Sequence, residues 1–427
     1  MIDIKHLREN SDLYKENAKR KFENPKQIDV VLKLDEEWRR LRHEEDGLRS
    51  ERNKISEEIN QAKKKKDGKN AKILIKKAKD IPAEIERIGE KTKKINFQLR
   101  KEICKISNIM SQRVPIGKDD SENVAEKYFG KPVKKNFKVK SNVEMMNVLG
   151  MADFESSARV SGVGYYYIEG DLALLNAALI NYARDFMVKK GFLYVETPLL
   201  LREEIIDQVT DLNDKQQQIF IVNDDPKMAL IGTSEHSLIG RFVGQEVSEK
   251  KLPIKHTSYS MCFRKEIGSH GIDEKGLFRT HQFNKIEMIV ICKPEESEKF
   301  FEELKGITVE IFKGLGIPIR VLKICSGDLG ALKYEQVDIE AFSPRKNGYF
   351  EVGSCSNLTD TQARKLGIFT RIKGERIVPH TLNNTALATS RALVAILENN
   401  QQKDGSVKIP KVLWPYMGGK KIIKKEK

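Results

Sequence analysis

Several features of secreted, disulfide-bonded or membrane proteins are scarce in this sequence. Its five cysteines, Cys104, Cys262, Cys292, Cys325 and Cys355, lie about thirty or more residues apart and form no CxxC pair. This spacing argues against a zinc ribbon and a disulfide framework, and it favours reduced thiols. No apolar run approaches the ~20 residues of a membrane span, and the N-terminus lacks the apolar core of a signal peptide. We therefore expect a cytoplasmic protein without a membrane segment.

Two common nucleotide-binding patterns are also missing. The chain contains neither GxGxxG nor a Walker A motif, so a Rossmann or P-loop site is not expected. Charge, by contrast, is abundant: 77 Lys and Arg face 62 Asp and Glu, for a net charge of +15. This excess favours a polyanionic partner such as nucleic acid, although an acidic membrane surface or a generally basic proteome remain alternatives.

The first third of the chain is a predicted helical hairpin, with almost no aromatic residues and one proline between Ile28 and Ile106. Apolar residues recur every seven positions at Leu34, Leu41, Leu48, Ile55 and Ala62. The companion positions Trp38, Glu45, Arg52 and Ile59 are only half apolar. A second apolar seam holds Ile81, Ile85, Ile88, Ile95, Leu99, Ile103 and Ile106. Two seams joined by the Asp67-Gly68 turn predict an antiparallel coiled coil of ~30-residue helices, roughly 45 Å long. Pro82 should start, kink or break the second helix.

The predicted tip of this hairpin is basic. Residues 1–110 hold 30 Lys and Arg against 21 Asp and Glu, a net +9. The excess gathers at the turn, on Lys63, Lys64, Lys65, Lys66 and Lys69. Two interpretations stay open: a solvated surface that confers solubility, and a phosphate-binding tip on a long arm.

The remainder is predicted to be an α+β domain. We expect a helical arm over residues 1–110, a linker over 111–142 that holds Pro115, Gly117, Gly130 and Pro132, and a large domain over 143–427. Predicted helices are Asp171–Lys190, Pro294–Gly314, Thr359–Leu366 and Thr385–Asn399. Predicted strands are Ile219–Val222, Met228–Gly232, His256–Arg264, Gln282–Ile291, Ile319–Cys325, Lys333–Phe342 and Tyr349–Ser354. Because strands mostly follow strands, an antiparallel sheet flanked by helices is expected.

The stretch from Tyr259 to Val290 is the richest in chemistry, and it reads as strand, loop and strand. Gly268, Gly271 and Gly276 are expected to free the loop. Arg264 ends the first strand, whereas Phe283 and Glu287 lie on one face of the second because side chains alternate. A single arginine or glutamate here would most simply form a surface ion pair. Together they indicate a pocket.

This hairpin, with FRKE and then GLFRTHQFNKIEM, resembles motif 2 of class II aminoacyl-tRNA synthetases, and closely that of the seryl enzymes. The resemblance implies that Arg264 binds the α-phosphate of ATP, Arg279 other phosphate oxygens, Phe283 the adenine and Glu287 the substrate ammonium. Lys265 and Glu266 join this ATP-binding set. A guanidinium suits the role because it neutralises phosphate charge without losing its proton. His281 needs no general-base role, since the serine carboxylate is already ionised.

Other stretches extend the resemblance in the right order. Leu382–Asn400 resembles motif 3, which implies that Arg391 binds the γ-phosphate. Gly191–Pro198 (GFLYVETP) resembles motif 1, which implies a homodimer. IGTSEH resembles the serine-binding loop, which implies substrate contacts by Thr233, Ser234 and Glu235. FEVGSCSN resembles the stretch that binds ATP and Mg²⁺, which implies Glu351, Val352, Gly353 and Ser354 for ATP, with Glu351 and Ser354 on the metal.

Asn383 and Thr385 should line the serine side-chain pocket, because a polar pocket recognises a hydroxyl strongly. The sequences TSEH and NNTALATSR resemble the archaeal and eukaryotic branch. The zinc-dependent type is not expected, since its Cys/His cluster is missing.

The resemblance implies ATP-dependent activation of L-serine, its transfer to tRNA(Ser) and also to tRNA(Sec), and an arm that binds the long variable arm of the tRNA. The expected cofactors are ATP and Mg²⁺. Three alternatives remain: a class II enzyme for another amino acid such as threonine, an RNA-binding scaffold with an inactive synthetase-like domain, and a carrier-protein ligase. The intact set Arg264, Glu287, Glu351 and Arg391 argues against an inactive domain, and the arm argues against a carrier-protein ligase.

Overall fold

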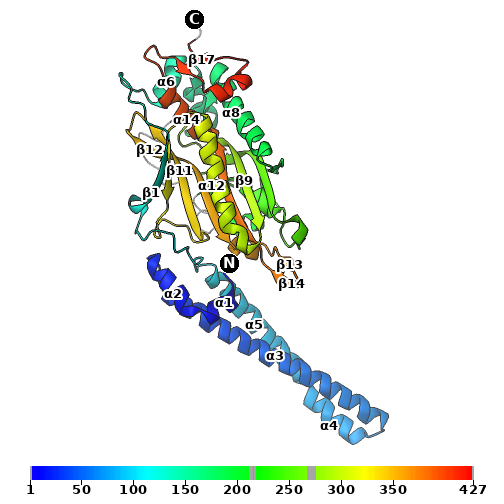
Figure 1. Ribbon diagram of the computed structural model, residues 1–427. Helices are drawn as coiled ribbons and strands as arrows, with labels where there is room; N and C mark the ends of the chain where they lie inside the picture. Colours follow the sequence, from blue (N-terminus) through cyan, green and yellow to red (C-terminus); the bar gives the residue numbers. More distant parts are fainter. Residues whose placement is uncertain (1, 211–214, 216–217, 267–275, 426–427) are drawn as a thin grey trace. The chain divides into compact units, whose positions relative to one another are not determined.

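The chain forms two compact units. The computed structural model describes residues 2–210, 215, 218–266 and 276–425. Unit 1 spans Met1–Ser107 and unit 2 spans Asn108–Lys427 (Figure 1). Gly268 and Gly271, which were expected to free the loop of the hairpin, lie outside the described residues. Among the helices in the described ranges, none has both the length and the apolar character needed to cross a membrane.

Unit 1 is the helical hairpin. Its helices are α1 Ile4–Glu9, α2 Ser11–Arg20, α3 Lys26–Lys64, α4 Gly68–Ala78 and α5 Ile81–Ile103. Helices α3 and α5 pack along each other, as Figure 1 shows, which confirms the predicted coiled-coil arm. At 39 residues α3 exceeds the expected length, and it spans about 58 Å.

The seam between α3 and α5 is apolar with one charged interruption. Leu41, Ile55 and Ala62 of α3 are buried, together with most of the predicted isoleucine seam of α5. Glu45 is also buried, and Arg49 Nη2 donates to its Oε1 at 2.6 Å. Gly89 lies beside this carboxylate, and a Cβ there would make an ordinary contact, 3.7 Å from Glu45 Oε1. The half-apolar companion positions therefore still take part in the helix contact.

The hairpin tip is a short turn followed by a new helix. Helix α3 ends at Lys64, and Asp67 accepts a hydrogen bond from the Asn70 backbone N–H at 3.1 Å, which caps α4. Pro82 is the second residue of α5, where no helical N–H is needed. Of the outcomes expected for this proline, it therefore starts the helix. The tip lysines are exposed.

Unit 2 is built on an eight-stranded sheet in the order β1-β10-β11-β12-β15-β9-β8-β4. The strands are β1 Val124–Phe129, β10 Ile319–Lys323, β11 Glu335–Ser343, β12 Gly348–Thr359, β15 His380–Ala388, β9 Gln282–Cys292, β8 Ile254–Phe263 and β4 Leu193–Tyr194. All neighbours pair antiparallel except β4 and β8. Strand β1 lies within residues 111–142, the expected linker, and forms one edge of the sheet.

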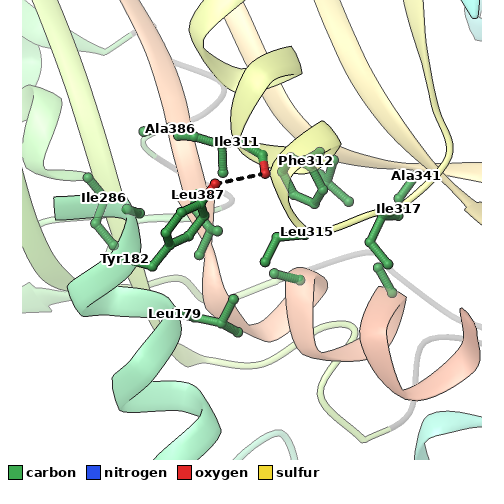
Figure 2. Packing of buried hydrophobic residues seen from close by; sticks show 14 of the residues in the cluster. Leu179, Tyr182, Ile286, Ile311, Phe312, Leu315, Ile317, Ala341, Ala386 and Leu387 are labelled. Carbon is green, nitrogen blue, oxygen red and sulfur yellow. Dashed lines mark hydrogen bonds between the residues drawn. The ribbon is translucent and has the colours of Figure 1, made fainter. Parts of the chain in front are cut away.

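Three long helices cover one face of the sheet (Figure 1). They are α8 Gly170–Lys189, α12 Ser297–Gly314 and α14 Thr389–Asn400. Helix α14 begins four residues later than predicted, because Thr385–Ala388 continue β15 and pair with β9. Figure 2 shows the packed core between these layers, in which the Tyr182 hydroxyl donates to the Ile311 carbonyl at 3.4 Å.

The remaining elements are shorter. The shorter helices are α6 Asn142–Leu149, α7 Phe154–Ser161, α9 Glu203–Val209, α11 Ser234–Gly240 and α13 Thr361–Lys365. The shorter strands are β2 Ala152–Asp153, β3 Tyr167–Ile168, β5 Leu200–Arg202, β6 Ile221–Val222, β7 Met228–Leu230, β13 Thr370–Ile372, β14 Glu375–Ile377, β16 Val407–Lys408 and β17 Ile422–Ile423. Helices α9, α11 and α13 pack on the opposite face with Ile289 and Ile291 of β9, beside the site, whereas α6 and β16 contact α14. Strand β9 has two buried faces: Ile286 and Met288 join the core under the long helices, whereas Ile289 joins a second core with α9 and α11.

Candidate active site

Two adjoining cavities open over the face of the sheet opposite the long helices. The larger, of about 940 Å³, is lined by Thr233, Glu235, Glu287, Asn383 and Thr385, among others. The smaller is lined by Glu266, Phe278, Arg279, Phe283, Val352, Gly353 and Arg391, among others. Four residues line both cavities: Arg264, Lys285, Glu351 and Thr385. Most of the residues expected to bind serine and ATP are thus gathered in one place.

Glu287 is the centre of the larger cavity. It is 2% exposed, and its Oε2 accepts hydrogen bonds from Thr233 Oγ1 and Thr385 Oγ1, each at 3.3 Å. The sheet register produces this meeting, because Thr385 pairs directly with Glu287 across β15 and β9. Lys285, two residues earlier on the same face, forms an ion pair with the same oxygen. Lys285 was not among the predicted site residues, although strand alternation places it between Phe283 and Glu287.

Glu235 is a second acid in this cavity, and it is half-buried. Its Oε1 accepts hydrogen bonds from Gln362 Nε2 at 2.9 Å and from Asn383 Nδ2 at 3.0 Å. Burial and the nearby charge of Glu287 raise its pKa to about 7. The two amide donors fix its position without neutralising it. Gln362 was missed because it lies in α13, far along the chain, and no sequence pattern connects it to Glu235.

Two of the expected contact residues lie elsewhere. The Ser234 side chain is fully buried and donates to the Ser258 carbonyl of β8 at 3.5 Å, away from the residues that line the cavities. The Lys265 backbone N–H donates to the Gln218 carbonyl at 2.8 Å, and this lysine lines neither cavity. In the described part of the chain, the side chains of Ser234 and Lys265 therefore do not line the cavities.

The smaller cavity combines cations with aromatic rings. Arg264 Cζ lies 5.4 Å from the centre of the Phe283 ring, and its Nε donates to the Gly232 carbonyl at 3.1 Å. Arg391 Cζ lies 5.4 Å from the Phe278 ring. An aromatic face beside guanidinium groups suits a nucleotide base joined to phosphates.

Glu351 is an acidic residue that lines both cavities. Arg391 Nη1 lies 3.0 Å from Glu351 Oε2. Burial alone would raise the pKa of Glu351, but the charge and hydrogen bond of Arg391, together with the charges of Arg264 and Lys333, outweigh it and hold that pKa below its usual range. Asp338 faces Ser354 across β11 and β12, and burial together with the Glu351 charge raises its pKa to about 7. Two carboxylates that repel each other beside a hydroxyl fit a hard divalent cation. Glu351 and Ser354 were predicted from the sequence, whereas Asp338 was not.

The stretch resembling motif 1 lies beside these cavities. Its strand, β4, forms the edge of the sheet beside β8. The Pro198 carbonyl that follows accepts a hydrogen bond from Ser237 Oγ of α11 at 2.6 Å. This contact links the sheet edge to the helix that begins at the Thr233 loop.

This sheet and these cavities define a class II aminoacyl-tRNA synthetase. A family model for the tRNA synthetase class II core domain (G, H, P, S and T) matches residues 220–400, and a model for the seryl-tRNA synthetase N-terminal domain matches residues 1–110. A serine–tRNA ligase from Methanocella arvoryzae is 43% identical over 98% of this chain and 99% of that protein.

Solved structures agree with this assignment. Seryl-tRNA synthetase from Pyrococcus horikoshii complexed with ATP matches with a TM-score of 0.94 and 38% identity, over 100% of both chains. The cytoplasmic serine–tRNA ligase from Naegleria fowleri in complex with AMP matches with a TM-score of 0.90 and 33% identity, over 100% of this chain and 99% of that chain. The chain belongs to the seryl-tRNA synthetase family. Its enzyme class is therefore that of the serine–tRNA ligases, which disfavours the threonine and carrier-protein alternatives.

Proposed function

We propose that unit 2 activates L-serine with ATP and that the whole chain transfers the seryl group to tRNA. The observation that carries this proposal is the junction of the two cavities, where a buried acid suited to an ammonium adjoins cations suited to phosphate. A carboxylate oxygen of serine attacks the α-phosphorus of ATP. The new O–P bond forms as the bond from that phosphorus to the bridging oxygen breaks, and pyrophosphate leaves. A terminal ribose hydroxyl of the tRNA then attacks the seryl carbonyl and displaces AMP.

The larger cavity would hold serine. Glu287 supplies the negative charge for the ammonium, with Thr233 beside it. Glu235, held by Gln362 and Asn383, is placed to accept a hydrogen bond from the serine hydroxyl. An alanine could not donate this hydrogen bond, and a site built to bind a hydroxyl discriminates strongly against an analogue that lacks it.

The smaller cavity would hold ATP. Phe283 offers a ring face for adenine, while Arg264, Arg279 and Arg391 face the phosphates. Arg264 borders both cavities, so its guanidinium is placed to neutralise the α-phosphate during attack. Binding of reactants in one orientation accounts for much of the acceleration in such in-line transfers.

Glu351 and Ser354 would hold Mg²⁺, with Asp338 as a further oxygen donor. The raised pKa of Asp338 beside Glu351 is the feature that a cation relieves. When bound, the metal supplies positive charge to the phosphates of ATP.

Unit 1 would bind the long variable arm of tRNA(Ser), and of tRNA(Sec), through the exposed lysines at its tip. Shape and phosphate contacts suit double-stranded RNA, whose deep groove hides the base edges. The motif 1 stretch at the sheet edge would form a homodimer, consistent with the exposed Leu193 at that edge.

The decisive experiment is ATP–pyrophosphate exchange with each of the twenty amino acids in the absence of tRNA. Exchange with serine alone is expected. Exchange with a different amino acid would overturn the proposed substrate, and no exchange with any of them would favour an inactive domain. Sedimentation equilibrium tests the dimer, and aminoacylation of each tRNA transcript tests the two tRNA partners.

A further inference from the structure

Lys285 is a buried lysine at the junction of the two cavities. Only 5% of it is exposed, yet it lines both the larger and the smaller cavity. A buried ammonium is stable only when it is paired, because burial removes its hydration. The role of Lys285 therefore depends on which charged group its ammonium is paired with.

The partner of Lys285 is the acid expected to receive the substrate ammonium. Its Nζ forms an ion pair with Glu287 Oε2, the oxygen that also accepts from Thr233 and Thr385. This arrangement resembles an alkylammonium bound to a carboxylate oxygen that also accepts hydrogen bonds from two hydroxyls. An incoming ammonium must take the same oxygen and displace a like charge.

The other charges around Lys285 are balanced. Burial lowers the pKa of His236, and the charges of Arg264 and Lys285 lower it further. Burial and the charge of Glu287 raise the pKa of Glu235. With the Glu351–Arg391 ion pair included, three acids and three cations thus meet around the junction. An amino acid adds one charge of each sign, on groups within about 3 Å of each other on one carbon. A lysine displaced from Glu287 therefore meets a carboxylate within the reach of its flexible stem.

We propose that Lys285 exchanges partners when serine binds: it leaves Glu287 to the substrate ammonium and binds the substrate carboxylate, which it holds toward the α-phosphate. This inference rests on the proposed activation of serine at this site. It makes Lys285 a substrate-binding residue that selects for a free carboxylate. If it were only a permanent counter-ion of Glu287, it would contribute equally to the binding of any serine derivative.

The test compares L-serine with L-serinamide, which has the same ammonium and hydroxyl but no carboxylate charge. The dissociation constants of both are measured by calorimetry for the full chain and for Lys285→Met. We expect the variant to bind serine about ten-fold or more weakly, since a charge-assisted contact is lost. Serinamide affinity should stay equal or rise, because the competing internal ammonium is gone.

Two further variants serve as an alternative and a control in this test. Lys285→Gln keeps a hydrogen-bond donor for Glu287 without the charge, and it should show the same selective loss if Lys285→Met does not fold. Lys255→Gln is the matched control, because Lys255 of the adjacent strand pairs with Glu303 at 2.6 Å and lines neither cavity. It should leave both constants unchanged.

Unchanged serine affinity in both Lys285 variants, or an equal loss for serine and serinamide, would overturn the proposal. The wild-type exchange assay separates this result from failure of the proposed function. Serine-dependent exchange by the wild type with no selective loss in the variants rejects only the role of Lys285.

Discussion

Arg391 contacts Glu351 at two oxygen atoms: its Nη1 lies 3.0 Å from the carboxylate Oε2 and donates to the Glu351 backbone carbonyl at 2.9 Å. One guanidinium thus sets both the charge and the position of a residue proposed to hold Mg²⁺. Its placement depends on two distant segments, since β12 carries the acid and α14 carries the base.

Replacing Arg391 should therefore impair ATP use more than serine use. We expect Arg391→Met to raise the KM for ATP in the exchange reaction by about 10–100-fold, through loss of a charge-assisted phosphate contact. The KM for serine should change little. Arg364→Met is a suitable control, because Arg364 pairs with Asp360 and lines neither cavity. Equal changes in both KM values would contradict a role specific to ATP.

Serine binding should strengthen as the pH rises from 6 to 8. The pKa of Glu235 is raised to about 7 in the free site, and a hydroxyl that donates to its carboxylate favours the ionised form. Binding therefore releases a proton, and affinity should increase by up to about ten-fold across this window. Calorimetry in buffers of different ionisation enthalpy measures both effects. Glu235→Gln should bind serine more weakly and with a flat pH profile, so a persistent slope in this variant would assign the proton to another group.

Asp338 should lower the stability of the protein at neutral pH. Its pKa is raised from 3.8 to about 7 in the folded chain, so the folded state holds the proton more tightly than the unfolded state. Stability attributable to this group is full below pH 4 and falls as the pH rises toward 7, by up to about 4 kcal/mol. We expect Asp338→Asn to raise Tm at pH 8 and to leave it unchanged at pH 4. The opposite pH trend would contradict this assignment.

Two glycines of α12 provide a matched stability test. A Cβ at Gly306 would meet nothing within 4 Å, whereas one at Gly314 would lie 2.3 Å from the Tyr182 hydroxyl. Gly306→Ala should stabilise unit 2 by about 0.5–1 kcal/mol. Gly314→Ala should destabilise it by about 1–3 kcal/mol, because the core around Tyr182 in Figure 2 is already full. Denaturant unfolding measures both, and similar effects at the two positions would be inconsistent with this packing.

The tip of unit 1 can be tested apart from the catalytic site. Changing Lys63, Lys64, Lys65, Lys66 and Lys69 to glutamine should leave exchange intact and raise the KM for tRNA in charging. The salt dependence of tRNA binding should weaken at the same time, because fewer counterions are released. Lys91, Lys93 and Lys94, remote from the tip in sequence, offer a control triple substitution. Normal charging by the tip variant would leave these lysines a solubility role.

The sequence predicted the arm, and it named most of the residues that the fold gathers at the two cavities, because those features are local or periodic. The seven-residue repeat predicted α3, and alternation along β9 placed Phe283 and Glu287 on one face. Gln362 and Asp338 could not be predicted in this way. Gln362 reaches Glu235 across 127 positions of chain. Asp338 meets Ser354 only through the register of β11 and β12. The start of α14 was placed too early, because pairing of β15 with β9 overrides the helical tendency of Thr385–Ala388.

Strand β9 contributes side chains both to the cavities and to the core. Phe283, Lys285 and Glu287 face the cavities, while Ile286 and Met288 alternate with them and face the core. Because the side-chain period is two, a slip of one residue would bury the charges and expose the apolar side chains to substrate. A single inserted or deleted residue within β9 should therefore abolish stability and activity together.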